Sequence, residues 1–364
     1  MTIRTLFFTL CLVLPRIAMA ADSEAVPLGV ITELTGSNAA NGLDCRRGIE
    51  VARSEFAPQD LAGGRNVQII FADHAGDAKT GVNEFKKLVE FNHIWAAVVT
   101  RSQVGMPLNP ISAQAHVPLL GTVGHPLFVP ANPYAFRFYP SVETEGLPLA
   151  EAASRLKARR LSVLSTEDEW TLALAKSFIA RYRELGGVLD NQLTIQTDDN
   201  EVSSVISKLK AGKPEAVFVN LTIAHSGLII RKLREQGYHG IILTNFWGAH
   251  PDSIAKAGME NMEGVIFTQV NLNRPVFQQR FRSLSGPDTT ATSVTYCCYS
   301  ALSALLQTIA ANKGIRGSDD LAAALQQQAA IHLLDEELRI TGRDVRYDII
   351  AKVIRQGKII DFQP

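Results

Sequence analysis

The sequence lacks the features that mark several large classes of protein. Its 36 basic residues equal its 36 acidic ones, and it has neither a basic block nor a basic helix with an apolar face. Charge therefore gives no case for nucleic-acid or membrane-surface binding. A phosphate-binding loop is missing too, because Gly212 and Lys213 lack the earlier glycine and the following Ser or Thr of a P-loop. Nucleotide and nucleic-acid binding are disfavoured.

Groupings that perform catalysis or hold a metal are equally scarce. Ser226 lies where a hydrolase elbow would need a glycine two residues earlier, but that residue is Ala224. The eight histidines form no i, i+4 pair for zinc. Asp73, His74 and Asp77 are the one compact cluster of ligand types, and such residues after a strand more often form a polar turn. We expect no enzyme activity, no metal and no cofactor.

Long apolar runs are confined to the amino terminus. Arg4 is followed by an apolar run at 6–14, which is about half the length needed to span a bilayer. Residues 18–20, Ala-Met-Ala, fit signal peptidase, so residues 1–21 are predicted to be a secretory signal cleaved near Ala20. Cys11 lies behind Leu10 rather than a small residue, which disfavours lipid attachment. The mature chain, with 34 basic and 36 acidic residues, has no later run that should cross a membrane.

Cysteine is rare in the exported chain. Cys45, Cys297 and Cys298 remain, an odd number, so at least one stays free or pairs between chains. A bond between the neighbours Cys297 and Cys298 would strain the backbone, and 296–309 has the pattern of a buried helix. We expect the three to be small core residues, with no disulfide framework holding the fold.

What the sequence does contain is a regular alternation of short apolar runs and longer amphipathic segments. The runs predict strands at 28–31, 67–72, 96–99, 161–164, 216–220 and 240–243. The amphipathic segments predict helices at 42–56, 80–91, 172–185, 202–209 and 226–236. Strands this apolar are buried on both faces, as in parallel sheets covered by helices. We predict doubly wound parallel α/β lobes whose ligand site lies at the carboxyl ends of the strands.

The order of several motifs resembles one family. LGVI at 28–31, ELTG at 33–36 and RGIEVA at 47–52 resemble the opening of the branched-chain amino-acid-binding protein family. These are periplasmic solute receptors of ABC transporters with the type I binding-protein fold. Segments that continue the likeness are 72–78, 102–111, 118–124, 136–137, 186–187 and 203–209.

The resemblance implies two lobes joined by a three-segment hinge that close on a ligand. We expect the chain to cross between the lobes near 137–141, 267–270 and 338–342. The first lobe would then comprise 22–138 and 269–337, and the second lobe would comprise 139–268 and 338–364.

The resemblance also implies the ligand-binding residues. Ser102, with Thr122 and Gly124 on the next loop, is expected to hold a ligand carboxylate, although Ser102 could merely cap the following helix. Trp170 falls where the second lobe of the family contributes an aromatic residue to the ligand site, although it could instead be a packing residue at the start of a helix. Thr222 matches a further segment that contacts the ligand in the family.

Departures from the family pattern bear on the ligand. Phe246, followed by Trp247, stands where amino-acid binders carry an acidic residue for the ligand ammonium, and Asn41 replaces an aromatic residue. Arg101 and Gly76 stand where many relatives have a disulfide. A buried ammonium without a carboxylate partner is costly, which disfavours an ordinary α-amino acid unless Asn220 or Glu167 substitutes.

The predicted function is capture of a small carboxylate-bearing solute, an amino acid or an aromatic or aliphatic acid, for delivery to an inner-membrane ABC permease by a periplasmic monomer. A sensory module that signals to a regulator or receptor kinase is the alternative.

Overall fold

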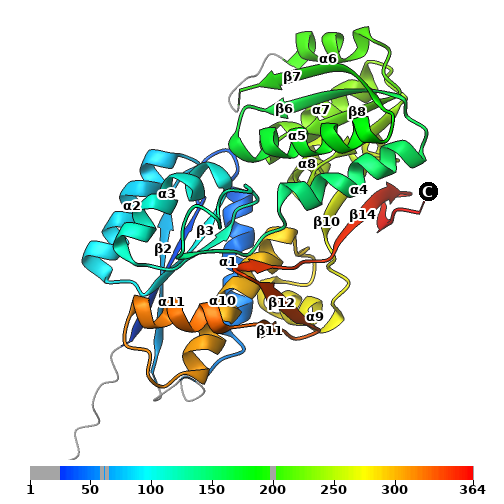
Figure 1. Ribbon diagram of the computed structural model, residues 1–364. Coiled ribbons are helices and arrows are strands. Elements are labelled where there is room, and N and C mark those ends of the chain that lie inside the picture. The colour runs from blue at the N-terminus through cyan, green and yellow to red at the C-terminus, as the bar shows by residue number, and fades with distance from the viewer. Residues whose placement is uncertain (1–24, 58–60, 62–64, 197–201, 364) are drawn as a thin grey trace, which may run out of the picture.

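The computed structural model describes residues 25–57, 61, 65–196 and 202–363, so the predicted signal sequence lies outside the described residues. Figure 1 shows two α/β lobes set side by side, one containing the amino-terminal strands and the other the middle of the chain. The two lobes have separate sheets, which confirms the prediction of doubly wound α/β lobes.

The first lobe is built on a sheet with the strand order β11-β12-β13-β5-β4-β3-β1-β2. Its strands are β1 (Val26–Thr32), β2 (Val67–Asp73), β3 (Ala96–Thr100), β4 (Leu119–Thr122), β5 (Ala135–Arg137), β11 (Ala330–His332), β12 (Glu337–Thr341) and β13 (Asp344–Val345). Its helices are α1 (Ala39–Arg53), α2 (Ala78–Asn92), α3 (Ser102–Ala115), α9 (Pro275–Ser285), α10 (Ser293–Ala311) and α11 (Ser318–Gln327).

The second lobe has a sheet with the order β15-β14-β10-β9-β8-β6-β7. Its strands are β6 (Arg160–Thr166), β7 (Val188–Ile195), β8 (Ala216–Asn220), β9 (Ile241–Thr244), β10 (Ile266–Val270), β14 (Ile349–Arg355) and β15 (Lys358–Asp361). Its helices are α4 (Val142–Arg155), α5 (Glu169–Glu184), α6 (Val202–Ala211), α7 (Ile223–Glu235), α8 (Pro251–Ala257) and the 3-10 helices η3 (Phe246–Ala249) and η4 (Met259–Met262).

Both sheets are covered on two faces, which explains why their strands read as unbroken apolar runs. In β3, Val98 packs with α1 and α10, whereas Val99 packs on the opposite face with α2 and α3. In β8, Phe218 faces α4 and α5 while Val219 faces α6 and α7. Successive residues of a strand point to opposite faces, so a strand between two helix layers needs apolar residues at every position.

The predicted elements are present with ends shifted by at most three residues. Central strands pair in parallel as expected, but each sheet ends in antiparallel strands formed late in the chain, β11 with β12 and β14 with β10 and β15. Strands β11, β12, β14 and β15 were not predicted, because β11 has three residues and the other three carry many exposed or half-buried positions.

The third crossing between the lobes differs from the prediction. Residues 338–342 were expected to cross, but β12 and β13 belong to the first sheet, where Asp344 pairs with Arg137 of β5. The chain therefore crosses at 346–348, immediately before β14. Residues 138–141 form the first crossing, close to the predicted 137–141. The second crossing follows Val270, so the prediction of 267–270 was wrong, because those residues belong to β10 of the second sheet. Asp344 and Arg137 are 207 residues apart in the sequence and form an ion pair at 2.5 Å. Pairing between strands so distant in the chain cannot be predicted from local sequence pattern.

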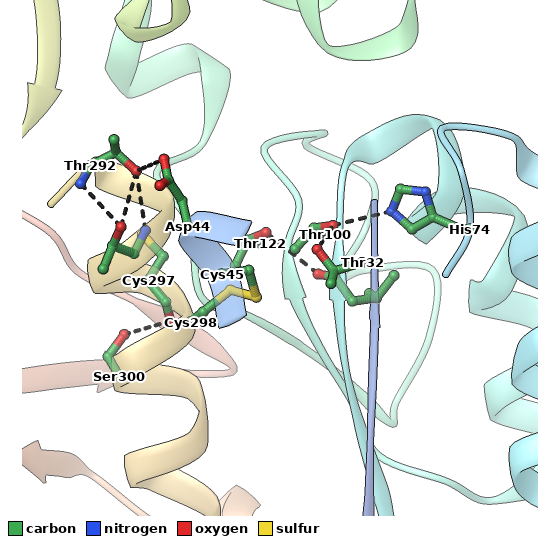
Figure 2. Close-up of a disulfide and its surroundings, with 12 residues drawn as sticks. Thr32, Asp44, Cys45, His74, Thr100, Thr122, Thr292, Cys297, Cys298 and Ser300 are labelled. Carbon is green, nitrogen blue, oxygen red and sulfur yellow. Dashed lines mark hydrogen bonds between the residues drawn. A yellow bond between two sulfur atoms is a disulfide. The ribbon is translucent and has the colours of Figure 1, made fainter. Parts of the chain in front are cut away.

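The expectation for the cysteines is wrong in part. Cys45 on α1 and Cys298 on α10 form a disulfide, shown in Figure 2, while Cys297 is a buried free thiol. The two half-cystines are 253 residues apart in the sequence, and only the packing of α1 against α10 brings them together. Close packing at Gly48, where a Cβ would lie 2.0 Å from the Thr295 carbonyl oxygen, allows this approach.

Helix α10 also corrects the expectation about membrane spans. By length and hydropathy Ser293–Ala311 meets the criteria for a transmembrane helix, yet 83% of its apolar window is buried inside the first lobe. It is the core helix that the pattern at 296–309 predicted.

Candidate functional site

A crevice between the two lobes gathers most of the predicted site residues. Its cavity volume is about 20 Å³, which is room for very few waters. The residues that line it are Asn41, Arg101, Ser102, Gln103, Thr122, Tyr139, Asp168, Trp170, Phe246, Trp247 and Val294. Of the seven predicted residues, Asn41, Ser102, Thr122, Trp170 and Phe246 are on the wall.

The first-lobe wall is centred on the start of α3. Strand β3 ends at Thr100, Arg101 turns the chain with φ +71°, and Ser102 begins the helix. Ser102 is 2% exposed, and its Oγ has no hydrogen-bond partner among the described residues. The helix-capping interpretation of Ser102 is therefore wrong, because the N-cap position belongs to Arg101 and α3 has no side-chain cap. An uncapped helix N-terminus favours an anion.

The next loop carries the other two first-lobe residues. Thr122 ends β4 and lies on the wall. Gly124 is behind it, packed against the second lobe, and a Cβ at Gly124 would lie 2.8 Å from Cδ1 and Nε1 of Trp170. Glycine at 124 thus allows the loop of one lobe to approach the indole of the other.

The second-lobe wall is aromatic. Trp170, in the first turn of α5, is 4.7 Å from Trp247 and 5.6 Å from Phe246 between ring centroids, and Tyr139 is 5.9 Å from Phe246. The Trp170 indole is 5% exposed and its Nε1 has no hydrogen-bond partner among the described residues. Phe246 and Trp247 form η3, whose N-cap Asn245 accepts from the Trp247 backbone N–H at 2.9 Å.

Asp168 is the acidic side chain on this wall. It caps α5, accepting from the backbone N–H groups of Trp170 and Thr171 at 3.0 and 3.1 Å and from the Thr171 hydroxyl. Burial raises the pKa of Asp168, while Arg101 and these hydrogen bonds oppose the rise. The carboxylate is thereby engaged in holding its own helix.

The lobes contact each other around the crevice. Trp247 Nε1 donates to Asn41 Oδ1 at 3.3 Å, and His250 Nε2 lies 3.1 Å from Asp44 Oδ2. Asp44 also accepts from Thr292 Oγ1 at 2.9 Å, as Figure 2 shows. Because the Trp247–Asn41 and His250–Asp44 contacts join opposite lobes, the structure is a closed form.

Thr222, like Gly124, is a predicted residue that does not line the crevice. It is buried at the N-cap position of α7, where its backbone N–H donates to Thr166 Oγ1 at 3.2 Å. Its own Oγ1 has no hydrogen-bond partner among the described residues, but it does not line the crevice.

Arg101 is the functional candidate that sequence reasoning noticed only as a replaced cysteine. Its Nη1 donates to Glu33 Oε2 at 2.6 Å, and both side chains are at most 5% exposed. The guanidinium carbon lies 5.8 Å from the Trp247 ring centroid. The available signal was a charged residue at a position where the family resemblance implies a cysteine, since burying an ion there is otherwise unfavourable.

A buried polar cluster lies behind the crevice at the hinge. Tyr139 belongs to the first crossing, Tyr347 to the third, and Cys297 of α10 interacts with both. Glu145 of α4 is 2% exposed, and burial raises its pKa to about 8. It is consequently protonated at neutral pH.

The cluster of Asp73, His74 and Asp77 is a polar turn, as expected. Asp73 accepts from the backbone N–H groups of Leu34 and Ala75, and Asp77 caps α2 through the Thr80 N–H. Burial, with a contribution from Arg101, lowers the pKa of His74 to about 4. Each side chain serves a different backbone segment, and no metal-ligand group is found among the described residues.

Two lobes joined by three crossings, with polar groups and rings meeting in the crevice, define a hinged ligand-binding protein. Residues 25–346 match the family model described as periplasmic binding protein. The chain belongs to this family, since the match covers most of its length.

Similar proteins agree with this assignment. "Leu/Ile/Val-binding protein homolog 3" of Brucella melitensis is 24% identical over 86% of this chain and 85% of its own. The leucine-binding protein LivK of Thermotoga maritima has a TM-score of 0.85 at 21% identity, covering 93% of this chain and 98% of its own. A solute-binding protein of Rhodopseudomonas palustris in complex with 3,4-dihydroxybenzoic acid has a TM-score of 0.83 at 15% identity, covering 93% and 96%.

Proposed function

We propose that this protein captures a small carboxylate-bearing solute between its lobes in the periplasm and delivers it to an ABC permease. The supporting observation is the pair of unpartnered polar atoms on opposite walls. Ser102 Oγ on the first lobe and Trp170 Nε1 on the second are both buried and both able to donate a hydrogen bond. A carboxylate in the crevice would satisfy them, and charge-assisted hydrogen bonds are the strong kind.

The body of the ligand would lie against the rings of Trp170, Phe246 and Trp247. Aromatic side chains offer a large contact area with little rotamer entropy to lose. Solved relatives bind ligands of both candidate classes, since one is in complex with isoleucine and another with benzoate. Either an amino acid or an aromatic acid has a counterpart in the family.

A ligand screen tests the capture step. The mature protein, cleaved near Ala20, would be unfolded and refolded to remove carried-over ligand, then heated with single carboxylic acids and amino acids. A ligand at one hundred times its Kd adds about 2.7 kcal/mol of stability, which a thermal shift detects. Capture of a carboxylate is contradicted if no compound in either class shifts the melting temperature.

Ser102→Ala is the variant that tests the carboxylate contact. Loss of a hydrogen bond to a charged group costs about 1.5–3 kcal/mol, so the Kd should rise roughly 10- to 100-fold. Ser283→Ala, at an exposed position on α9 of the same lobe, is the matched control and should bind as the unaltered protein does.

Delivery is tested separately. Ligand-loaded protein should stimulate ATP hydrolysis by its permease complex reconstituted in liposomes. Tight capture without such stimulation would instead favour the sensory role, because ligand binding is common to both functions.

A further inference from the structure

We infer that Arg101 makes the crevice selective for carboxylic acids that have no α-ammonium group. This inference rests on the proposed capture of a carboxylate and names the class of that solute. It starts from the position of the side chain. Arg101 lines the crevice beside Ser102, with its guanidinium close to the Trp247 ring that forms part of the opposite wall.

The surroundings of Arg101 are arranged to hold a guanidinium. Arg101 Nη1 donates a hydrogen bond to Glu33 Oε2 at 2.6 Å, and Nη2 donates one to Gln103 Oε1 at 3.4 Å. Gly76 makes room, because a Cβ there would lie 2.8 Å from Glu33 Oε1 and 3.5 Å from Arg101 Nη1. The backbone of Arg101 takes a positive φ of 71°, which a non-glycine residue adopts only when the surrounding structure enforces it.

The stability of the fold does not by itself explain why Arg101 and Glu33 form a buried ion pair. A buried ion pair loses its hydration, and apolar residues of similar volume often replace it without loss of stability. A guanidinium has five N–H donors, of which two donate to described residues in the bonds to Glu33 and Gln103. Arg101 lines the crevice, so a carboxylate held there is within reach of a group suited to bind it, because a planar guanidinium matches the geometry of a carboxylate.

The hydrogen-bonding groups around the crevice also favour an anion over an ammonium. Two fully buried side-chain atoms of lining residues, Ser102 Oγ and Trp170 Nε1, have no partner among the described residues and can donate to an anion. Asp168, the acidic side chain on the wall, already accepts three hydrogen bonds at the start of α5. A ligand ammonium would therefore meet a guanidinium and donors, with the nearby carboxylate engaged elsewhere.

Matched pairs of ligands test this inference. L-Leucine and 4-methylpentanoate differ only in the α-ammonium, as do L-phenylalanine and 3-phenylpropanoate. Titration calorimetry at neutral pH should show the deamino acid binding at least tenfold more tightly within whichever pair fits the crevice. A preference for the amino acid, or equal affinities, would overturn the inference and leave the capture of a carboxylate standing.

Variants of Arg101 provide the second arm. Arg101→Met should weaken binding of the deamino acid at least tenfold and reduce its preference over the amino acid. Arg101→Met alone leaves the buried Glu33 carboxylate without its ion-pair partner. The double variant Glu33→Gln with Arg101→Met removes both charges, so it should fold and should show the same loss of affinity for the deamino acid. Lys87→Met, at an exposed ion pair on α2, controls for removing one positive charge.

The outcomes separate the two proposals. Unchanged affinity for the deamino acid in the double variant would show that Arg101 is structural. Absence of binding by both members of both pairs and by benzoate, in the unaltered protein, would remove the proposed capture of a carboxylate and this inference with it.

Discussion

The two lobes share one architecture but present different chemistry to the crevice. The first lobe contributes polar groups, Arg101, Ser102 and Thr122, near the uncapped start of α3. The second contributes the rings of Trp170, Phe246 and Trp247. A ligand with a charged head and an apolar body is stabilised fully only when both walls reach it, so the division of chemistry links binding to closure.

The lobes also differ in how they are held together. The first has a disulfide between α1 and α10, whereas the described part of the second contains no cysteine. The half-cystine Cys45 is next to Asp44, which contacts His250 of the second lobe. The cross-linked lobe thus provides the more constrained surface against which the other closes.

The largest effect is expected from the aromatic wall. Trp170→Ala removes an indole from the centre of the crevice and should weaken binding by about 3 kcal/mol, roughly 100-fold, the range seen for central aromatic anchors. Trp170→Phe keeps a ring but removes the Nε1 donor, so calorimetry should show a smaller loss of about tenfold. Equal losses in both variants would mean that the hydrogen bond, and not the ring, dominates.

An exposed ring supplies the control for this pair. Phe91 on α2 is 75% exposed, and Phe91→Ala should leave the Kd unchanged.

Removing the disulfide should separate stability from recognition. The double variant Cys45→Ala with Cys298→Ala is expected to lose about 2–4 kcal/mol of unfolding free energy, because the cross-link restricts the unfolded chain. Ligand affinity should change less than twofold, since neither residue lines the crevice. Urea denaturation measures the first and calorimetry the second.

Cys297→Ala is the comparison for the cysteines, because it removes only the buried free thiol. If its denaturation midpoint falls as far as that of the double variant, the cross-link adds nothing beyond packing.

Glu145, which lies in the buried cluster at the hinge and does not line the crevice, should make stability depend on pH. Folded Glu145 keeps its proton up to about pH 8, whereas an unfolded glutamate loses it near 4.5. The folded state binds the extra proton between these values, so unfolding free energy should fall as pH rises through that window, by an amount on the order of a few kcal/mol. Glu145→Gln cannot ionise and should flatten the profile and raise the melting temperature at pH 8.

Melting curves at intervals from about pH 5 to about pH 8 check this expectation. Glu90→Gln, at an exposed position of α2, should retain the slope. A slope that persists unchanged in Glu145→Gln would assign the pH dependence to other groups.

The smallest effect is expected where the lobes contact each other beside the ligand. His250→Asn keeps a residue able to cap α8 but is too short to reach Asp44. Loss of this hydrogen bond should destabilise the closed form by about 1 kcal/mol and raise the Kd several-fold. Small-angle scattering at subsaturating ligand should show a larger fraction of open molecules than in the unaltered protein.

Local pattern was enough to predict much of this molecule. The central strands and their covering helices follow from periodicity, because each depends on residues near it in the chain. The resemblance in motif order pointed to Ser102, Thr122 and Trp170, which line the crevice. The edge strands β12 and β13 were misassigned to the other lobe, since pairing of Asp344 with Arg137 is a long-range event.

By itself, the sequence determined an α/β fold with parallel strands covered by helices, because strands buried on both faces must be apolar at every position. Only the tertiary structure decided that Cys45 meets Cys298, that Thr222 stays behind the wall, and that Arg101 pairs with Glu33 beside Ser102. These depend on segments far apart in the chain that meet in space, and their contacts are made only when the helices pack and the lobes close.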